Sequence, residues 1–276
     1  MNSVTAIRTA KSPAFTNLLR NFSVTATSPE KGFLSSFFEK KVEVQSGTHS
    51  DKLSDKDRIF ELCTHNVKPD SLDKYIKTTE NLIGFVNDNK ETLHGENIGS
   101  FQVSVGDQDQ FVHLWRFDGG YANIGENLKF LASNKDYKAI QKDMLPLLRS
   151  RHSQYLMKFS FWPEVELRNG SNIYELRSYH LKPGTMVEWG NYWAKAIRLR
   201  DYKHTEGYIG MFSQVGELYN VKHIWCYNGL EERRQARETV WQHQQSQWQD
   251  IVANTVPLIR KMTSRIMVPL TVSPTK

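Results

Sequence analysis

The chain has 276 residues, of which 39% are hydrophobic and 24% charged, a composition typical of a folded globular protein. Charged residues interrupt every hydrophobic run, so no stretch reaches the roughly 18 apolar residues that a membrane-spanning helix needs. The formal charge is +6. Outside the N-terminal segment, however, basic residues alternate with acidic ones, as in EERRQARE at 231–238. This alternation is typical of a solvated helix face and argues against nucleic-acid binding.

The first thirty residues have the composition of a mitochondrial transit peptide. They carry basic residues, many Ser and Thr, and no acidic residue before Glu30, and they lack the apolar core of a secretory signal. We therefore interpret residues 1–30 as a transit peptide, with the bond between Phe22 and Ser23 as the preferred cleavage site. A plain terminal tail is the alternative.

Residues 31–58 change from an apolar cluster, GFLSSFF, to a polar run, GTHSDKLSDKDR. They show neither the alternation of a strand nor a sustained helical stripe. We interpret this segment as a linker or arm. Whether it docks on the body of the protein or on a partner stays open.

From residue 59 onward the sequence repeats itself. IFELCTHNVKP at 59–69 is matched by IYELRSYHLKP at 173–183, an offset of 114 residues. Further along, HLW and PLLR in the first copy are matched by HIW and PLIR in the second, and the offset drifts only to 110 or 111. Two copies of one domain are therefore expected. Their bounds are 59–161 and 173–270, with a C-terminal tail at 271–276.

Within each copy the hydrophobic period changes in a fixed order. The first copy predicts a strand ending at Pro69, a helix from Leu72 to Val86, a hairpin around Gly106, a helix from about Tyr121 to Leu148 and a strand at 154–161. The second copy predicts a strand ending before Pro183, a helix from Met186 to Ile197, a hairpin around Gly216, a helix from about Glu231 to Arg260 and a strand at 264–270.

This βαββαβ order is that of the ferredoxin-like unit. Such a sheet carries both helices on one face and leaves its other face uncovered. The second copy can cover that face. The predicted fold class is therefore α+β, with tandem ferredoxin-like repeats whose two sheets pack face to face as an internal pseudo-dimer of the dimeric α/β-barrel type.

Strand alternation divides the side chains of each strand between two faces. We expect the more apolar set, which includes Phe60 and Leu62, to meet the helices, so the polar set should point into the space between the sheets. This candidate inter-sheet pocket comprises Glu61, His65, His113, Trp115, Glu175, Arg177, Tyr179, His223 and Trp225.

Three interpretations are possible for a low-dielectric space that contains carboxylates, imidazoles, an arginine and indoles. The preferred one is a structural network, in which buried charges such as Glu175 and Arg177 satisfy each other. The second is a pocket for an aromatic small molecule or haem. The third is a catalytic site, in which a Glu and a His exchange protons near neutral pH.

Several familiar functional motifs are absent from the sequence. It has no Walker loop, no GxSxG and no HExxH, so no catalytic residue is assigned. Its two cysteines, Cys63 and Cys226, have no spacing that indicates zinc or a disulfide framework. We expect no metal and no cofactor.

Three phrases, NIYELRSYHLKPGTMVEWGNYWAKAI, GDQDQFVHLWRFDGGY and SRIMVPL, resemble the NIPSNAP family and in particular its mitochondrial members. The resemblance spans about residues 31–274. It implies a tandem dimeric α/β-barrel fold and residence in mitochondria. It also implies a role in mitochondrial quality control, or mitophagy, in which autophagy adaptors and Atg8-type modifiers are recruited to damaged mitochondria. It implies no catalytic residue.

We therefore expect a mitochondrial interaction or signalling protein rather than an enzyme, resident in the matrix and displayed at the outer surface on damage. The alternative is a small-molecule or haem-binding protein, or a cofactor-poor enzyme, that uses the polar pocket. A cavity that reaches His113 or His223 from solvent would favour this alternative, whereas a filled interior would favour the interaction protein. The partner surface, the submitochondrial compartment and homo-oligomerisation stay open.

Overall fold

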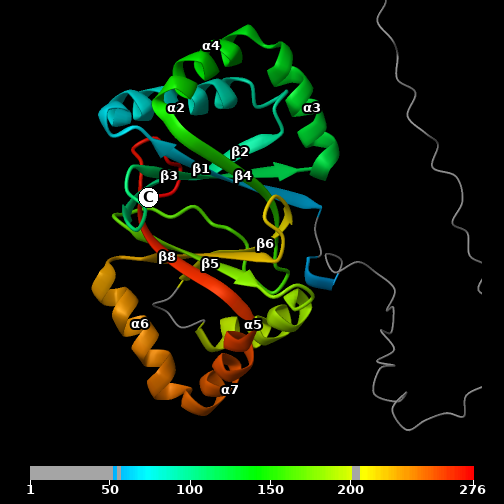
Figure 1. Cartoon of the computed structure of the whole chain (residues 1–276), viewed down its shortest axis with the longest axis vertical. Helices are drawn as coiled ribbons and strands as arrows, with labels where there is room; N and C mark the ends of the chain where they lie inside the picture. The colour runs from blue at the N-terminus through cyan, green and yellow to red at the C-terminus, as the bar shows by residue number, and fades with distance from the viewer. Residues whose placement is uncertain (1–51, 55–56, 201–205) are drawn as a thin grey trace, which may run out of the picture. The chain divides into compact units, whose positions relative to one another are not determined.

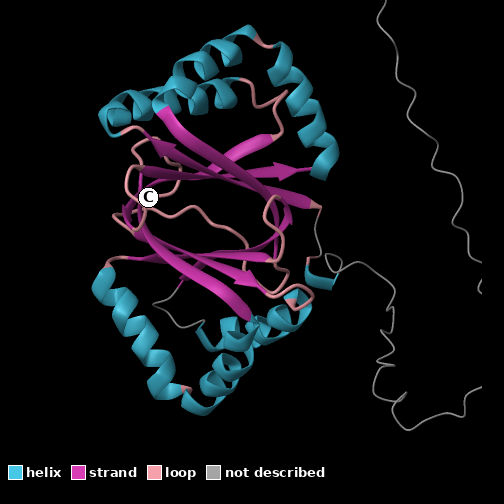
Figure 2. Cartoon of the chain, in the orientation of Figure 1, coloured by secondary structure: helices cyan, strands magenta, loops and turns pink. Residues whose placement is uncertain are grey.

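The computed structural model describes residues 52–54, 57–200 and 206–276. The expected transit peptide and its cleavage site lie outside the described residues, as does most of the linker. Eight strands form a closed antiparallel barrel, and Figures 1 and 2 show it between two layers of helices. None of the helices that the structure describes has the length and apolar character needed to cross a bilayer.

The first half of the barrel begins with a strand of alternating side chains, which ends two residues before Pro69. Its elements are β1 (Arg58–Val67), α2 (Leu72–Asp88), β2 (Gly95–Val105), β3 (Gln110–Asp118), α3 (Gly120–Ser133), α4 (Lys135–Met144) and β4 (Leu148–Lys158). Short 3-10 turns at Pro69–Ser71 and Leu145–Leu147 precede α2 and β4.

The second half shows the same order of elements. These are β5 (Ile173–Leu181), α5 (Met186–Arg200), β6 (Glu206–Val215), β7 (Asn220–Tyr227), α6 (Leu230–His243), α7 (Gln245–Thr255) and β8 (Ile259–Pro269). A 3-10 turn at Val256–Leu258 precedes β8.

The second helix of each copy, expected as one continuous helix, is two helices in the structure. In the first half the break falls at Asn134, which has extended backbone and whose side chain accepts a hydrogen bond from the Tyr137 amide. This is the geometry of an N-cap, and it starts a new helix. In the second half the break falls at Gln244. The expectation of one helix per copy at this place was therefore wrong.

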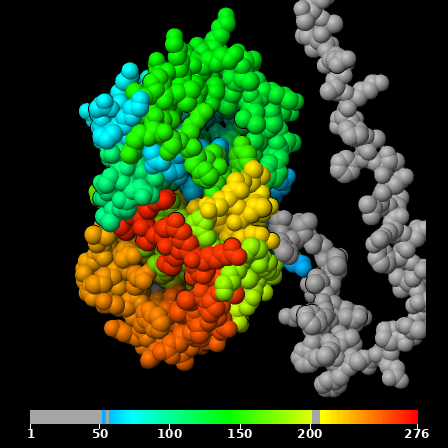
Figure 3. Space-filling view, in the orientation of Figure 1, coloured from blue at the N-terminus to red at the C-terminus, as the bar shows by residue number. Residues whose placement is uncertain are grey.

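The α+β class expected from the sequence is confirmed, but the two sheets do not remain separate. Strand β2 pairs with β8, and β4 pairs with β6, so that each half is joined to the other along both edges. In Figure 3 the red segment that includes β8 lies against green segments of the first half. Pairing at both edges leaves the barrel without an exposed strand edge.

The interior of the barrel holds the apolar set of strand residues, the reverse of the expected orientation. Phe60 and Leu62 of the first half share one buried cluster with Leu176 and Ile224 of the second half. The interior of an eight-stranded barrel is just wide enough to be filled by side chains and is shielded on all sides. It therefore takes the most apolar residues, and the polar set is left to face the helices.

Two segments outside the expected repeats pack on the barrel. Leu53, at the end of the predicted linker, is buried and joins the cluster beneath the second-half helices. Beyond β8, the hydroxyl of Ser273 accepts a hydrogen bond from the Ser100 amide, and Thr275 bonds the hydroxyl of Tyr174. The expected C-terminal tail is thus held by specific contacts.

Candidate functional site: a cavity under the first-half helices

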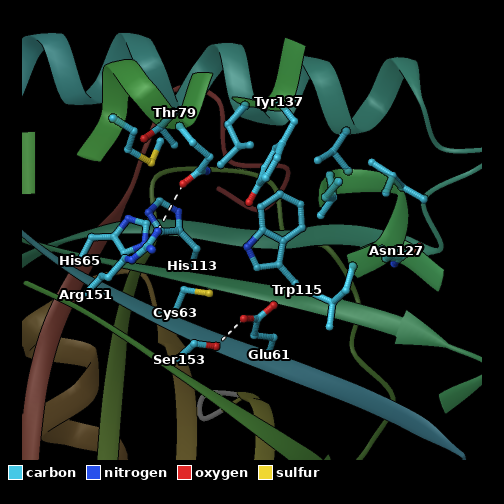
Figure 4. A pocket seen from close by; sticks show the side chains of 18 of the residues that line it. Glu61, Cys63, His65, Thr79, His113, Trp115, Asn127, Tyr137, Arg151 and Ser153 are labelled. Carbon is cyan, nitrogen blue, oxygen red and sulfur yellow. Dashed lines mark hydrogen bonds between the residues drawn. The ribbon is translucent and has the colours of Figure 1, made fainter. Parts of the chain in front are cut away.

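A cavity of about 440 Å³ lies between the first-half sheet and its helix layer. Its floor is formed by polar strand residues, and its helix side is mostly apolar. Figure 4 shows Glu61, Cys63 and Ser153 on the strands, below the helices. Four predicted site residues, Glu61, His65, His113 and Trp115, line this one cavity. The sequence predicted that these four share one pocket between the sheets with five second-half residues. The structure places the four on the helix side of the first-half sheet, and the other five, Glu175, Arg177, Tyr179, His223 and Trp225, do not line this cavity.

A chain of hydrogen bonds crosses the floor of the cavity. The hydroxyl of Tyr75, on α2, lies 2.7 Å from Nδ1 of His65 and 2.7 Å from Nε2 of His113. The other nitrogen of His113, Nδ1, lies 2.9 Å from the Ser100 hydroxyl, which donates to Oδ1 of Asn97. Two imidazoles on neighbouring strands are thereby linked through one helix residue.

Both imidazoles are neutral near pH 7. Burial lowers the pKa of His65 to about 4, and the charge of Arg151 lowers it further in the same direction. Burial likewise lowers the pKa of His113 to about 3, with a contribution from His65. Burial raises the pKa of Tyr75. The linked groups therefore act as hydrogen-bond donors and acceptors, not as ions.

Beside this chain, the Ser153 hydroxyl donates a hydrogen bond to the carboxylate of Glu61. Cys63 lies beside them, opposite Ser153 in the strand register, and burial, followed by the charge of Glu61, raises the pKa of its thiol well above the ordinary value. The thiol therefore stays protonated. In the part of the chain that the structure describes, no three His, Cys, Asp or Glu side chains are grouped to hold a metal ion.

The second half has the same strand register. Glu61 lies opposite Trp115 on β1 and β3, and Glu175 lies opposite Trp225 on β5 and β7. In the same way His113 lies opposite Cys63 of β1, and His223 lies opposite Arg177 of β5. Each of these two pairs therefore occupies equivalent positions in the two halves.

The environment of His223 differs completely from that of His113. Its ring lies 4.4 Å from that of Trp193, 4.7 Å from that of Trp162 and 5.2 Å from that of Tyr179, between centroids. Trp162 approaches the sheet so closely that a Cβ at Gly210 would lie 2.2 Å from its ring. Only glycine leaves room for this indole.

Neither ring nitrogen of His223 has a hydrogen-bond partner among the described residues. The sequence offset explains why. Trp189 stands where Tyr75 stands in the first half, and Gly210 pairs with His223 where Ser100 pairs with His113. Both hydroxyl groups that bind His113 are therefore missing around His223. Burial, with the charges of two arginines, lowers its pKa well below the ordinary value.

The space that is open in the first half is filled in the second. At an offset of 114 residues, Trp193 replaces Thr79, and Arg200 replaces Val86. Thr79 and Val86 line the cavity, whereas Trp193 lies on the imidazole of His223 and the Arg200 guanidinium lies 4.0 Å from the ring centre of Trp225. The smaller side chains of Thr79 and Val86 thus help to leave the first-half space open, and in the second half Trp162 adds to the filling.

The buried carboxylate of Glu175 is held mainly by a residue that the sequence did not indicate. Arg233, on α6, donates two hydrogen bonds to it, of 2.9 and 2.7 Å, and Ser264 donates one of 2.6 Å. The expected partner, Arg177, lies at 3.5 Å and makes its shorter bond, 2.8 Å, to Tyr179. Although burial opposes it, the Arg233 bonds lower the pKa of Glu175.

Comparison with known proteins identifies the family. The model of the NIPSNAP family matches residues 60–163 and 174–274. The chain belongs to the NIPSNAP family. It is 42% identical to the protein NipSnap of Drosophila melanogaster over 94% of both chains, and 44% identical to human NipSnap homolog 2 over 90% of this chain and 86% of that one.

Solved structures agree on the fold of this NIPSNAP protein. One, an anthrone oxidase-like protein, superposes with a TM-score of 0.53 over 79% of this chain and 93% of its own. The two sequences are only 11% identical. This likeness therefore concerns the arrangement of strands and helices alone.

Sequence reasoning missed four residues that shape the NIPSNAP site: Tyr75, Thr79, Ser100 and Arg233. A signal for three of them was present in the repeat itself. Aligning the copies places Thr79 against Trp193, and this change of size indicates that the two helix-covered spaces differ. The same alignment sets Tyr75 and Ser100 against residues that have no hydroxyl group. Arg233 gave no such signal, because it lies in a run that reads as solvent-exposed.

Proposed function

We propose that the protein binds a small molecule in the cavity between the first-half sheet and helices α2 to α4. One observation carries this proposal: about 440 Å³ is open beside His113, while Trp193 fills the corresponding space beside His223. Ligand cavities typically enclose about 300–1,000 Å³ with apolar walls and a few polar groups. A chain that needed only a packed core would gain stability by filling both spaces.

Replacing Thr79 with Trp should abolish ligand binding and leave the protein folded. The new indole would occupy the cavity as Trp193 occupies the second half, so the usual cost of overpacking should be absent. Fluorescence titration with 2-methoxynaphthalene, an apolar probe, should show one site in the wild type and none in Thr79→Trp. Thr79→Val, which keeps the volume, should bind as the wild type does. Equal binding by Thr79→Trp and the wild type would refute the proposal.

We also propose that the protein functions in mitochondria. The Ser- and Thr-rich composition of the N-terminal segment, which has no acidic residue before Glu30, supports this, together with the family resemblance. Import should remove the N-terminal segment by cleavage of the bond between Phe22 and Ser23. N-terminal sequencing of the protein from purified mitochondria should find Ser23 first, and retention of Met1 inside the organelle would contradict the proposal.

The role in mitochondrial quality control rests on the same resemblance. We propose that damaged mitochondria display the protein to autophagy adaptors and Atg8-type modifiers. Affinity purification from depolarised mitochondria should recover these partners, and purification from intact mitochondria should not. If neither adaptors nor modifiers were recovered under either condition, this proposal would be wrong. The proposal of ligand binding in the cavity would be unaffected.

We infer that the two halves arose by duplication of a ferredoxin-like unit. The repeated phrases and the repeated order of elements support this inference. The first unit has kept an open, polar space, and the second has been filled with aromatic and arginine side chains. On this view, binding is the task of one half, and the other half completes the barrel.

A further inference from the structure

The hydrogen-bond chain on the cavity floor has a single direction. The Ser100 hydroxyl donates its one proton to Asn97, so it can only accept from Nδ1 of His113. Nδ1 of His113 therefore carries the proton of this neutral imidazole, and Nε2 must accept. The proton between Nε2 and Tyr75 consequently belongs to the tyrosine.

The same reasoning fixes the tautomer of His65. Because the Tyr75 hydroxyl gives its proton to His113, its oxygen must accept from Nδ1 of His65. Neutral His65 then carries its proton on Nδ1 and a lone pair on Nε2. His65 lines the cavity, and within residues 57–200 and 206–276 no side chain or backbone group hydrogen-bonds to Nε2. Tyr75 is the positioning residue: by accepting the Nδ1 proton of His65, it keeps the lone pair of Nε2 free to accept a hydrogen bond.

A second polar group on the floor, the side chain of Glu61, is also an acceptor. Glu61 receives a hydrogen bond from Ser153 on one carboxylate oxygen. Arg151, which also lines the cavity, is exposed and bonds Gln141 at 3.3 Å. The cavity thus combines mostly apolar walls with two hydrogen-bond acceptors on its floor, Nε2 of His65 and the carboxylate of Glu61.

We propose that the ligand is a predominantly apolar molecule with a hydroxyl or N–H group, and that this group donates a hydrogen bond to Nε2 of His65. The inference rests on the proposed binding function and specifies its ligand class. A ligand without a donor would leave a buried acceptor unpaired, and this is the cost that separates otherwise similar molecules. An anionic ligand would instead require Arg151.

Three naphthalene probes of nearly equal size test the inference. 2-Naphthol carries a donor, 2-methoxynaphthalene does not, and 2-naphthoate is an anion. We expect 2-naphthol to bind about 10-fold more tightly than 2-methoxynaphthalene, the effect of about one hydrogen bond, and more tightly than 2-naphthoate. Equal binding of the two neutral probes, or a preference for 2-naphthoate, overturns the inference while binding itself stands. Binding of none of the three overturns both.

The variant His65→Phe removes the acceptor and keeps an aromatic ring. It should still bind 2-methoxynaphthalene, and the preference for 2-naphthol should fall to near parity. Tyr179→Phe is the matched control, because Tyr179 is the second-half equivalent of His65. It should keep the wild-type preference. Loss of the preference in Tyr179→Phe alone would overturn the inference.

A measurement on the unmodified protein is independent of how the variants fold. Long-range ¹H–¹⁵N NMR spectra distinguish a protonated from an unprotonated imidazole nitrogen. For His65 we expect an unprotonated Nε2 in the free protein and a shift of its resonance on addition of 2-naphthol. A proton on Nε2 of His65 in the free protein would overturn the assignment of this nitrogen as an acceptor.

Discussion

Lowering the pH from 7 to 5 should reduce the free energy of unfolding by about 6 kcal/mol, a large part of the roughly 5–15 kcal/mol typical of a domain. Three imidazoles cause this loss, of which two, His113 and His223, are buried and one, His65, is half-buried. The pKa of His65 is about 4, that of His113 is about 3, and that of His223 lies well below the ordinary value. In the unfolded chain each should titrate near about 6.5.

The sign follows from proton binding. Between pH 6.5 and about 4 the unfolded chain binds protons at these three positions and the folded chain does not, so acid favours unfolding. Their full contribution to stability is present above pH 6.5. It is lost at about 1.4 kcal/mol per pH unit and per histidine as the pH falls. The carboxylate of Glu175, whose pKa is lowered, loses its contribution only at more acidic pH.

Urea unfolding at pH 7 and pH 5 measures this effect. The variant His223→Phe supplies the control, since it removes an imidazole whose nitrogens have no partner in the described part of the chain. It should unfold at pH 7 much as the wild type does and lose about 2 kcal/mol less on acidification. A wild-type stability that is the same at both pH values would show that these histidines are protonated in the folded protein.

Replacing Arg233 with Met should lower the free energy of unfolding by about 3–5 kcal/mol, because Glu175 would be left as a buried charge without its bidentate partner. The side chain of Glu175 is fully buried. Arg177 should matter less, since it lies 3.5 Å from the carboxylate and bonds Tyr179 more closely. Replacing Glu175 and Arg233 together with apolar residues should recover most of the loss.

Arg234→Met is the matched control on the same helix. Arg234 is exposed and pairs with Glu231 and Glu238 at the surface, where ion pairs contribute little. Thermal melts should therefore show a large loss for Arg233→Met and almost none for Arg234→Met. If Arg177→Met were the more destabilising of the two Glu175-partner variants, the assignment of Arg233 as the main partner would be wrong.

Local patterns predicted most of the elements of the fold. The alternation from residue 58 to Pro69 gave the first strand, and the spacing from Leu72 to Val86 gave the first helix. Positions such as Glu61 and His113 were correctly placed on one face because strand parity depends only on counting residues. The break at Asn134 was missed, although Asn before Lys-Asp is a sequence that can cap a helix.

Other features depend on contacts that no local pattern contains. Both faces of each sheet are covered, one by helices and one by the opposite strands, so apolar character alone could not say which cover Phe60 meets. Closure of the barrel through β2 with β8 and β4 with β6 decides that question. Arg233 belongs to a charged run in which Arg234, Glu231 and Glu238 are exposed, and only the packing of α6 turns it toward Glu175.

The most direct test of the central claim is a crystal structure of the protein grown with 6-bromo-2-naphthol, in which anomalous scattering locates the bromine. The account predicts one site per chain, between α2 and the first-half sheet, with the ligand hydroxyl within hydrogen-bond distance of Nε2 of His65 and no site beside His223. Absence of bromine from the first-half cavity, or equal occupancy beside Trp193 in the second half, would contradict it.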